Sequence, residues 1–312
     1  MLGNLSVVYA VQPSIMVISD NHAGTVAVKA AAVAFGGRVL VDVSLAEAAL
    51  RLENQVAPDT LMLEITSDTG ARLDRTLDHI DRIASRDSVP TLVSIAPELI
   101  DAVSARIRNP LATILCSPSP AERVTAIALA WEERHARVNG RSQEFDALRL
   151  QHLADEVARI AKTLAGFSET PNLSGTPSQL SDAVLGYKFQ GDVLGTEEIS
   201  ASEIRAIIKL RRLRDRHFDP ELFADPAWDM MLDLMAARAE HSRVSVSSLC
   251  IAAAVPATTA LRWIKTLTDQ GVFIRVADPT DGRRVFIELS DKAAANISKY
   301  FTAMRRAGGL AI

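Results

Sequence analysis

The sequence is poor in the residues that build disulfide-linked or metal-stabilised folds. Its 312 residues include two cysteines, Cys116 and Cys250, and six histidines with no cysteine or carboxylate at ligand spacing. Neither a disulfide framework nor a metal site is expected, and two thiols fit a reducing cytoplasm. Both thiols are expected to be small buried groups, with oxidation sensing at Cys250 as the less favoured alternative.

Long apolar runs and catalytic motifs are also missing. No run approaches the ~20 apolar residues that span a bilayer, and the first residues lack the basic region of a secretory signal. There is no glycine-rich phosphate loop, nucleophile elbow or pair of catalytic carboxylates. We therefore expect a soluble cytoplasmic protein that is not an enzyme, binds no cofactor or metal, and has no membrane partner.

The composition is that of a globular protein with an uneven distribution of charge. Apolar residues make up 48% of the chain and charged residues 23%, and the length favours two domains. From Ser200 onward there are 17 Lys+Arg against 13 Asp+Glu, a balance of +4, whereas the rest has 17 against 25, a balance of −8. Such asymmetry hints at a nucleic-acid partner for the basic part, although solvated arginines would give the same count.

Residues 1–138 have the pattern of an α/β domain. Short apolar runs predict strands at 15–20, 38–43, 60–65, 91–96 and 112–117. Helical patterns separate them at 25–35, 45–55, 73–84, 99–107 and 121–137. Because strand and helix alternate five times, the sequence predicts a doubly wound parallel sheet, of the flavodoxin or receiver type.

Several phrases in this domain resemble a response-regulator receiver: ISD after the first strand, APDTLMLEI, VPTLVSIA, and CSP after the fifth. A working receiver would need an acidic pair for Mg²⁺, a phosphoacceptor Asp and a Lys. Here Asp20 remains but follows Ser19, Glu64 occupies the phosphoacceptor position, and Ser117 replaces the Lys. These departures predict a pseudo-receiver that binds a partner or dimerises without phosphorylation. Glu64 is a relic acidic group or, less favoured, a permanently charged mimic.

Residues 139–200 are predicted to hold a dimerisation helix and a flexible linker. Apolar residues at 3-4-3-4 spacing form its seam: Leu150, Leu153, Val157, Ile160 and Leu164. A short coiled coil and an amphipathic helix packed on its own domain are equally compatible with two heptads. Gly, Pro, Ser and Thr then dominate residues 166–200, as in a tether.

Residues 201–312 predict an α+β winged helix. A short helix capped by Ser245 or Ser247 precedes a second, which begins at Pro256 and ends at Gly271. Leu261, Ile264 and Leu267 should face inward, and Trp263 is also expected in the core. Two strands joined through Asp281-Gly282 follow as a hairpin, which completes a helix-turn-helix with a wing.

The phrases VPATTALRWIKTLTDQGVF and DPTDGRRVFIELSDKA resemble the recognition helix and wing of MarR-type regulators. The resemblance implies major-groove contact by the helix and minor-groove contact by the wing. The DNA-binding residues expected on this basis are Ser247, Thr258, Thr259, Arg262, Lys265, Arg283 and Arg284. It also implies that Asp281 orients the wing arginine. A large preceding domain is foreign to the family and puts a small-molecule inducer in doubt.

The sequence therefore favours a dimeric, phosphorylation-independent transcriptional regulator that binds double-stranded DNA in a sequence-specific way. One alternative is a protein-interaction adaptor whose winged helix and pseudo-receiver bind protein partners, including a signalling protein. A phosphorylatable response regulator is disfavoured by Glu64 and Ser117.

Overall fold

The computed structural model describes residues 12–138 and 199–306. We call the first range the sheet lobe and the second the winged-helix lobe. The described residues of 1–134 and 197–312 belong to one compact unit. The predicted dimerisation seam, from Leu150 to Leu164, lies outside the described residues, as does nearly all of the predicted linker.

The sheet lobe contains the predicted parallel sheet of five strands. The strands are β1 (Ser14–Ser19), β2 (Arg38–Ser44), β3 (Thr60–Ile65), β4 (Thr91–Ile95) and β5 (Ala112–Cys116). Their order is β2-β1-β3-β4-β5, and every neighbouring pair is parallel. β5 is therefore an edge strand, with one row of backbone groups facing away from the sheet.

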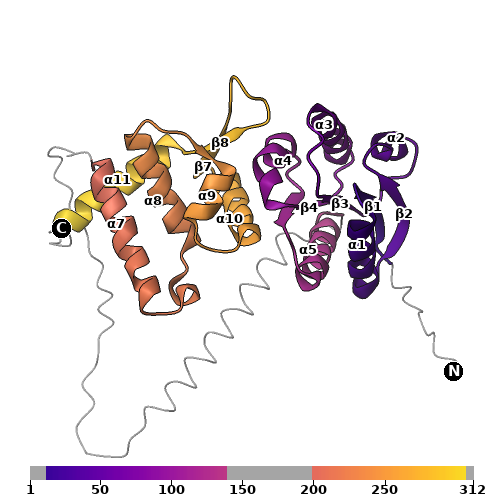
Figure 1. The fold of residues 1–312 in the computed structure, drawn as a ribbon, viewed down its shortest axis with the longest axis horizontal. Helices are drawn as coiled ribbons and strands as arrows, with labels where there is room; N and C mark the ends of the chain where they lie inside the picture. Colours follow the sequence, from indigo (N-terminus) through magenta and orange to yellow (C-terminus); the bar gives the residue numbers. More distant parts are fainter. Residues whose placement is uncertain (1–11, 139–198, 307–312) are drawn as a thin grey trace, which may run out of the picture. The chain divides into compact units, whose positions relative to one another are not determined.

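Helices cover both faces of this sheet (Figure 1). They are α1 (His22–Phe35), α2 (Ala48–Glu53), α3 (Ala71–Arg86), α4 (Ile100–Arg106) and α5 (Pro120–Val138), with a 3-10 turn at Pro97–Leu99. One core joins β1, β3, β4 and β5 to α1 and α5, and the other joins the opposite strand faces to α2, α3 and α4. The predicted α/β layering is thus confirmed, although α2 is shorter than the predicted 45–55.

The winged-helix lobe contains the predicted helices and hairpin. Its helices are α7 (Ala201–Leu213), α8 (Pro226–Ala239), α9 (Val246–Ala252), α10 (Ala257–Asp269) and α11 (Asp291–Arg306), with 3-10 turns at Arg214–Arg216 and Pro220–Phe223. Its strands are β6 (Val244–Ser245), β7 (Phe273–Ala277) and β8 (Val285–Leu289), in the antiparallel order β6-β8-β7. The loop between β7 and β8 projects as the wing (Figure 1).

α9 and α10 form the helix-turn-helix and are bent by 110° at their junction, within the range typical of this motif. Pro256 is the N-cap of α10, with φ −51° and ψ 140°, so the helix begins one residue later than predicted. Among the described residues, no single helix is long and apolar enough to cross a membrane; the α9–α10 pair reaches that length and hydropathy only across its bend.

Candidate nucleic-acid interface

α10 is held in the winged-helix lobe by one apolar face. Leu261, Ile264 and Leu267 are buried, as predicted from their spacing. Gly271 follows the helix with φ +69°, a left-handed conformation that suits glycine at a helix end. Trp263 was expected in the core, but this is wrong: its side chain is 38% exposed, because it points away from the inward-facing stripe.

Seven side chains form the predicted reading surface: Ser247, Thr258, Thr259, Arg262, Lys265, Arg283 and Arg284. Arg262 and Arg284 are exposed, whereas Ser247, Thr259, Lys265 and Arg283 are half-buried. Thr258 differs from the expectation of an outward-facing threonine because it is only 7% exposed. Ser247, Thr258, Lys265 and Arg283 form hydrogen bonds with the sheet lobe.

Hydrogen bonds within the wing fix its loop. Asp278 accepts hydrogen bonds from the backbone and hydroxyl of Thr280, and these two bonds lower the pKa of Asp278. Asp281 accepts a bond from the backbone N–H of Arg283 at 2.9 Å. The carboxylate of Asp281 lies 3.4 Å from Nε of Arg284, so it contacts the side chain of Arg284 and only the backbone of Arg283.

The side chain of Arg283 is paired with the sheet lobe. Its Nη2 donates to Asp68 at 2.7 Å and its Nε to Asp74 at 3.1 Å. The hydrogen bond with Arg283 lowers the pKa of Asp68, and the bond with Asp68 raises the pKa of Arg283. Asp74 is buried and also accepts from Arg106 at 3.3 Å. The wing arginine is therefore bound by two carboxylates.

Ser247, near the start of α9, is bound to the first turn of α4. Its backbone N–H donates to Asp101 at 2.9 Å and its hydroxyl to the other oxygen of that carboxylate at 2.5 Å. The N-cap of α9 is Ser245, which accepts from the backbone of Ser248. Both hydrogen-bonding groups of Ser247 thus face one acidic side chain.

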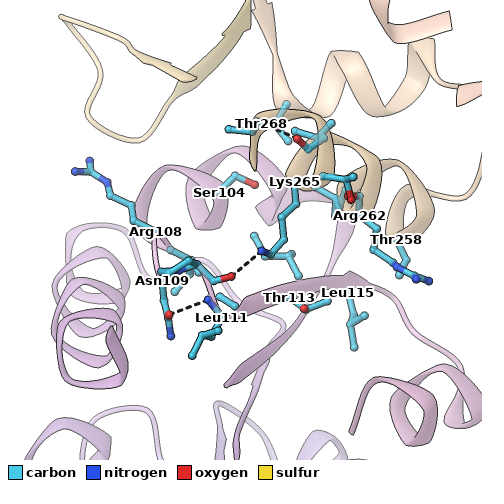
Figure 2. A pocket seen from close by; sticks show the side chains of 18 of the residues that line it. Ser104, Arg108, Asn109, Leu111, Thr113, Leu115, Thr258, Arg262, Lys265 and Thr268 are labelled. Atoms are coloured by element: carbon cyan, nitrogen blue, oxygen red, sulfur yellow. Dashed lines mark hydrogen bonds between the residues drawn. The ribbon is translucent and has the colours of Figure 1, made fainter. Parts of the chain in front are cut away.

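Two residues of α10 contact the edge of the sheet. The hydroxyl of Thr258 accepts from the backbone N–H of Cys116 at 2.9 Å and donates to its carbonyl at 3.2 Å. Lys265 donates to the carbonyl of Pro110 at 2.6 Å and to Asp269 at 3.1 Å, and Figure 2 shows its ammonium pointing toward the loop before β5. Arg275 of β7 also donates to the carbonyl of Ser104.

An open cavity of about 1030 Å³ accompanies these contacts. Side chains from both lobes line it, among them Arg108, Thr113, Arg262 and Lys265 (Figure 2). The lobes therefore meet through these polar contacts beside the cavity and through apolar residues that belong to one buried cluster.

Asp20, Glu64 and Ser117, which were predicted to form a degenerate phosphoacceptor site, lie near the carboxyl ends of β1, β3 and β5. Asp20 accepts from the backbone N–H groups of Thr66 and Ser67, each at 2.7 Å. Glu64 is buried and its carboxylate lies 2.7 Å from Nη2 of Arg123, which also donates to the carbonyl of Pro118. Ser117 follows β5 with φ +46°.

Glu64 and Arg123 form a buried ion pair, and Glu64 lies near the carboxyl end of β3. A Cβ added at Gly24 would lie 2.5 Å from Cγ of Glu64, so the longer side chain is accommodated beside a glycine. Sequence reasoning missed Arg123, because it lies 59 residues from Glu64 and belongs to no local motif. It also missed Asp68, Asp74 and Asp101, for which the charge asymmetry was the only sequence signal.

Comparison with known proteins assigns one part of the chain. Residues 234–293 match the family model of a winged helix DNA-binding domain. This segment is a winged helix domain. It covers α9, α10 and the wing, together with the end of α8 and the start of α11. The match spans less than a fifth of the chain, so it identifies a domain and not the whole protein. No curated protein matches the chain.

Several solved structures resemble parts of the chain at low similarity. A fusion with the yeast Spc42 trimeric coiled coil is 17% identical, with 49% of this chain and 99% of that chain covered and a TM-score of 0.34. The adhesin competence repressor of Streptococcus pyogenes is 17% identical. The match covers 34% of this chain and 74% of the repressor, with a TM-score of 0.22. The transcriptional regulator Tm0710 of Thermotoga maritima is 19% identical. The match covers 34% of this chain and 75% of that regulator, with a TM-score of 0.21. Likenesses of this size assign neither fold nor function.

Proposed function

We propose that this protein is a non-enzymatic transcriptional regulator that binds double-stranded DNA in a sequence-specific way. The observation that supports this most is the winged helix domain match over residues 234–293, together with the exposed guanidinium groups of Arg262 and Arg284. Arginine can donate two hydrogen bonds to a guanine edge, and an arginine on a hairpin can enter the narrow minor groove.

The sheet lobe then acts as a pseudo-receiver. Its strand order is that of flavodoxin-like folds, which include receivers. A phosphoryl group would have to displace the buried ion pair between Glu64 and Arg123, and no aspartate occupies the phosphoacceptor position. This supports regulation without phosphorylation. We also propose a homodimer, because two reading helices would address half-sites about one helical turn apart.

Selection from a random DNA library, using the full chain, tests the proposal. Sequencing of the retained duplexes is expected to recover a two-fold-related motif, and the Arg262→Ala variant is expected to lose preference at one base step. Exposed Arg38→Ala, in β2 of the sheet lobe, is the matched control and should recover the wild-type motif. Failure of the wild-type chain to enrich any motif would contradict sequence-specific binding.

The second candidate is the protein-interaction adaptor, and one observation favours it. Four residues of the reading surface already bind a protein surface, through Asp68, Asp74, Asp101, the carbonyl of Pro110 and the backbone of Cys116. An adaptor would retain little affinity for duplex DNA at any salt concentration. A regulator would show strong, salt-dependent binding, because counterions are released when its arginines and lysines contact phosphates.

A further inference from the structure

We propose that one face of the sheet lobe binds the reading surface in competition with DNA, so that the two lobes must separate before the winged helix engages a duplex. This inference rests on the proposed function. We call this surface the masking face and define it by Asp68, Asp74, Asp101, the carbonyl of Pro110 and the backbone of Cys116.

The residues that meet the masking face are those expected to read DNA. Ser247, Thr258, Lys265 and Arg283 come from three separate elements, α9, α10 and the wing, and each donates to it. A helix-turn-helix with a wing presents these three elements to a duplex together. One surface of the sheet lobe therefore engages four of the seven side chains that are expected to contact DNA.

The chemistry of the masking face resembles that of a nucleic-acid backbone. Asp101 accepts from the backbone N–H and the hydroxyl of Ser247, and groups of these two kinds are common donors to DNA phosphates. Asp68 and Asp74 bind the wing arginine through two nitrogens, as a phosphate binds arginine. The negative balance of the chain outside its last part, −8 against +4, has the sign that this pairing requires.

The contact also provides hydrogen-bond partners for backbone groups at the edge of the sheet. β5 is the last strand, so the N–H and carbonyl of Cys116 have no neighbouring strand on their outer side. The hydroxyl of Thr258 completes both hydrogen bonds. Exposed edges of this kind are usually covered, and here the covering element is the recognition helix. Thr258 is 7% exposed, so a base edge cannot reach it while α10 remains on β5.

Apolar residues also pack across the contact between the two lobes, as expected for an arrangement in which the reading surface is covered. One hydrophobic core includes β4, β5 and α4 of the sheet lobe together with α9, α10 and β8 of the winged-helix lobe. Arg262 and Arg284 nevertheless stay exposed, and an open cavity lies beside them. Exposed arginines attract a duplex at long range, while the buried remainder of the reading surface becomes accessible only on separation.

The test uses the full chain and leaves every residue of the reading surface unchanged. The variant D68A/D101A removes two carboxylates of the masking face. The control D42A/D87A also removes two carboxylates from the sheet lobe, and these pair with Lys29 and Arg86 within that lobe. Both variants change the net charge equally, so a general electrostatic effect on DNA binding is the same in both.

Binding is measured by fluorescence anisotropy with a labelled random-sequence duplex of 30 base pairs. When only a fraction of the molecules is competent, the apparent Kd rises by the inverse of that fraction. We expect D68A/D101A to bind about tenfold more tightly than wild type, and D42A/D87A to stay within about twofold of it. Equal affinity of the two variants would overturn the competition while leaving DNA binding by the winged helix intact.

Amide hydrogen exchange supplies a second readout that does not depend on a gain in affinity. The N–H groups of Cys116 and Ser247 donate across the contact, so saturating duplex should accelerate exchange of both in the wild-type chain. Unchanged exchange with duplex bound would overturn the proposal. If no form of the chain binds duplex, the proposed function fails, and the competition fails with it.

Discussion

The hydroxyl of Thr258 exchanges two hydrogen bonds with the backbone of Cys116, 142 residues away along the chain. Thr258 belongs to the helix expected to enter the major groove, and Cys116 belongs to the edge strand of a parallel sheet. The helix that we propose to read DNA therefore also covers the open edge of the sheet, and it joins the two lobes.

Replacing Arg262 by alanine should lower the preference of the protein for its selected motif. Loss of a bidentate contact to a base costs about 1–3 kcal/mol at one position. The measurement compares Kd for the selected duplex with Kd for duplexes changed at single base pairs. Arg38→Ala should leave all of these ratios unchanged, and the same ratios in Arg262→Ala as in wild type would exclude base contact by Arg262.

Replacing Arg284 by alanine should weaken binding to all duplexes and flatten its dependence on salt. Each phosphate contact contributes about −0.9 to the slope of log K against log salt concentration. Anisotropy titrations between about 50 and 200 mM salt would measure the slope for wild type, Arg284→Ala and Arg38→Ala. A slope for Arg284→Ala equal to that of wild type would place this side chain away from DNA phosphate.

Breaking the buried ion pair between Glu64 and Arg123 should destabilise the fold. Glu64→Ala should lower the free energy of unfolding by about 3–5 kcal/mol, because it leaves the buried guanidinium without its carboxylate. Removing Asp42 from the exposed pair with Lys29 should cost less than about 1 kcal/mol. Urea unfolding is measured for Glu64→Ala and Asp42→Ala. Addition of Arg123→Ala and Glu64→Ala/Arg123→Ala completes a double-mutant cycle and gives the coupling energy of the buried pair. An equal loss of unfolding free energy in Glu64→Ala and Asp42→Ala would contradict this prediction.

Acetyl phosphate should not phosphorylate the chain. The carboxylate of Glu64 is engaged with Arg123, and the Asp20 carboxylate is engaged with the backbone of Thr66 and Ser67. Mass spectrometry after incubation with acetyl phosphate and Mg²⁺ measures uptake. Incorporation that disappears in Glu64→Ala or Asp20→Ala would restore a receiver function to the sheet lobe.

The contact between the lobes should depend on pH only in acid. The bond from Arg283 lowers the pKa of Asp68 from its ordinary value of 3.8, so this pairing stabilises the closed arrangement above that value. The stabilisation is lost as the pH falls through the lowered pKa. The rate of hydrogen exchange at the Cys116 amide, divided by its intrinsic rate at each pH, should stay constant from about pH 6 to 8. A transition within that range would implicate a group other than Asp68.

Sequence patterns predicted local structure well because they reflect local physics. The five strands and the α9–α10 pair follow from runs and periods that burial on one face imposes. Contacts between the lobes follow no such rule. Asp101 and Ser247 are 146 residues apart, and the sequence around one residue does not indicate that it contacts the other. Trp263 was misplaced for a related reason, since its apolarity was judged without knowledge of which face of α10 is covered.

Sequence patterns named the side chains of the proposed reading surface, but they did not predict which of these side chains contact the sheet lobe. Arg262 and Arg284 are exposed, as a DNA-reading role requires, while Thr258 and Arg283 are engaged by the sheet lobe. A resemblance to a winged helix indicates which side chains face a duplex when one is bound. It contains no information about a second domain that offers carboxylates to the same side chains.

Binding of duplex DNA by the winged helix is tested by measuring affinity as a function of salt. With the full wild-type chain and its selected duplex, we expect Kd to rise steeply between about 50 and 200 mM salt, and a scrambled duplex of equal length to bind more weakly at both concentrations. If a chain that circular dichroism shows to be folded binds neither duplex at the lower salt concentration, the winged helix does not bind DNA.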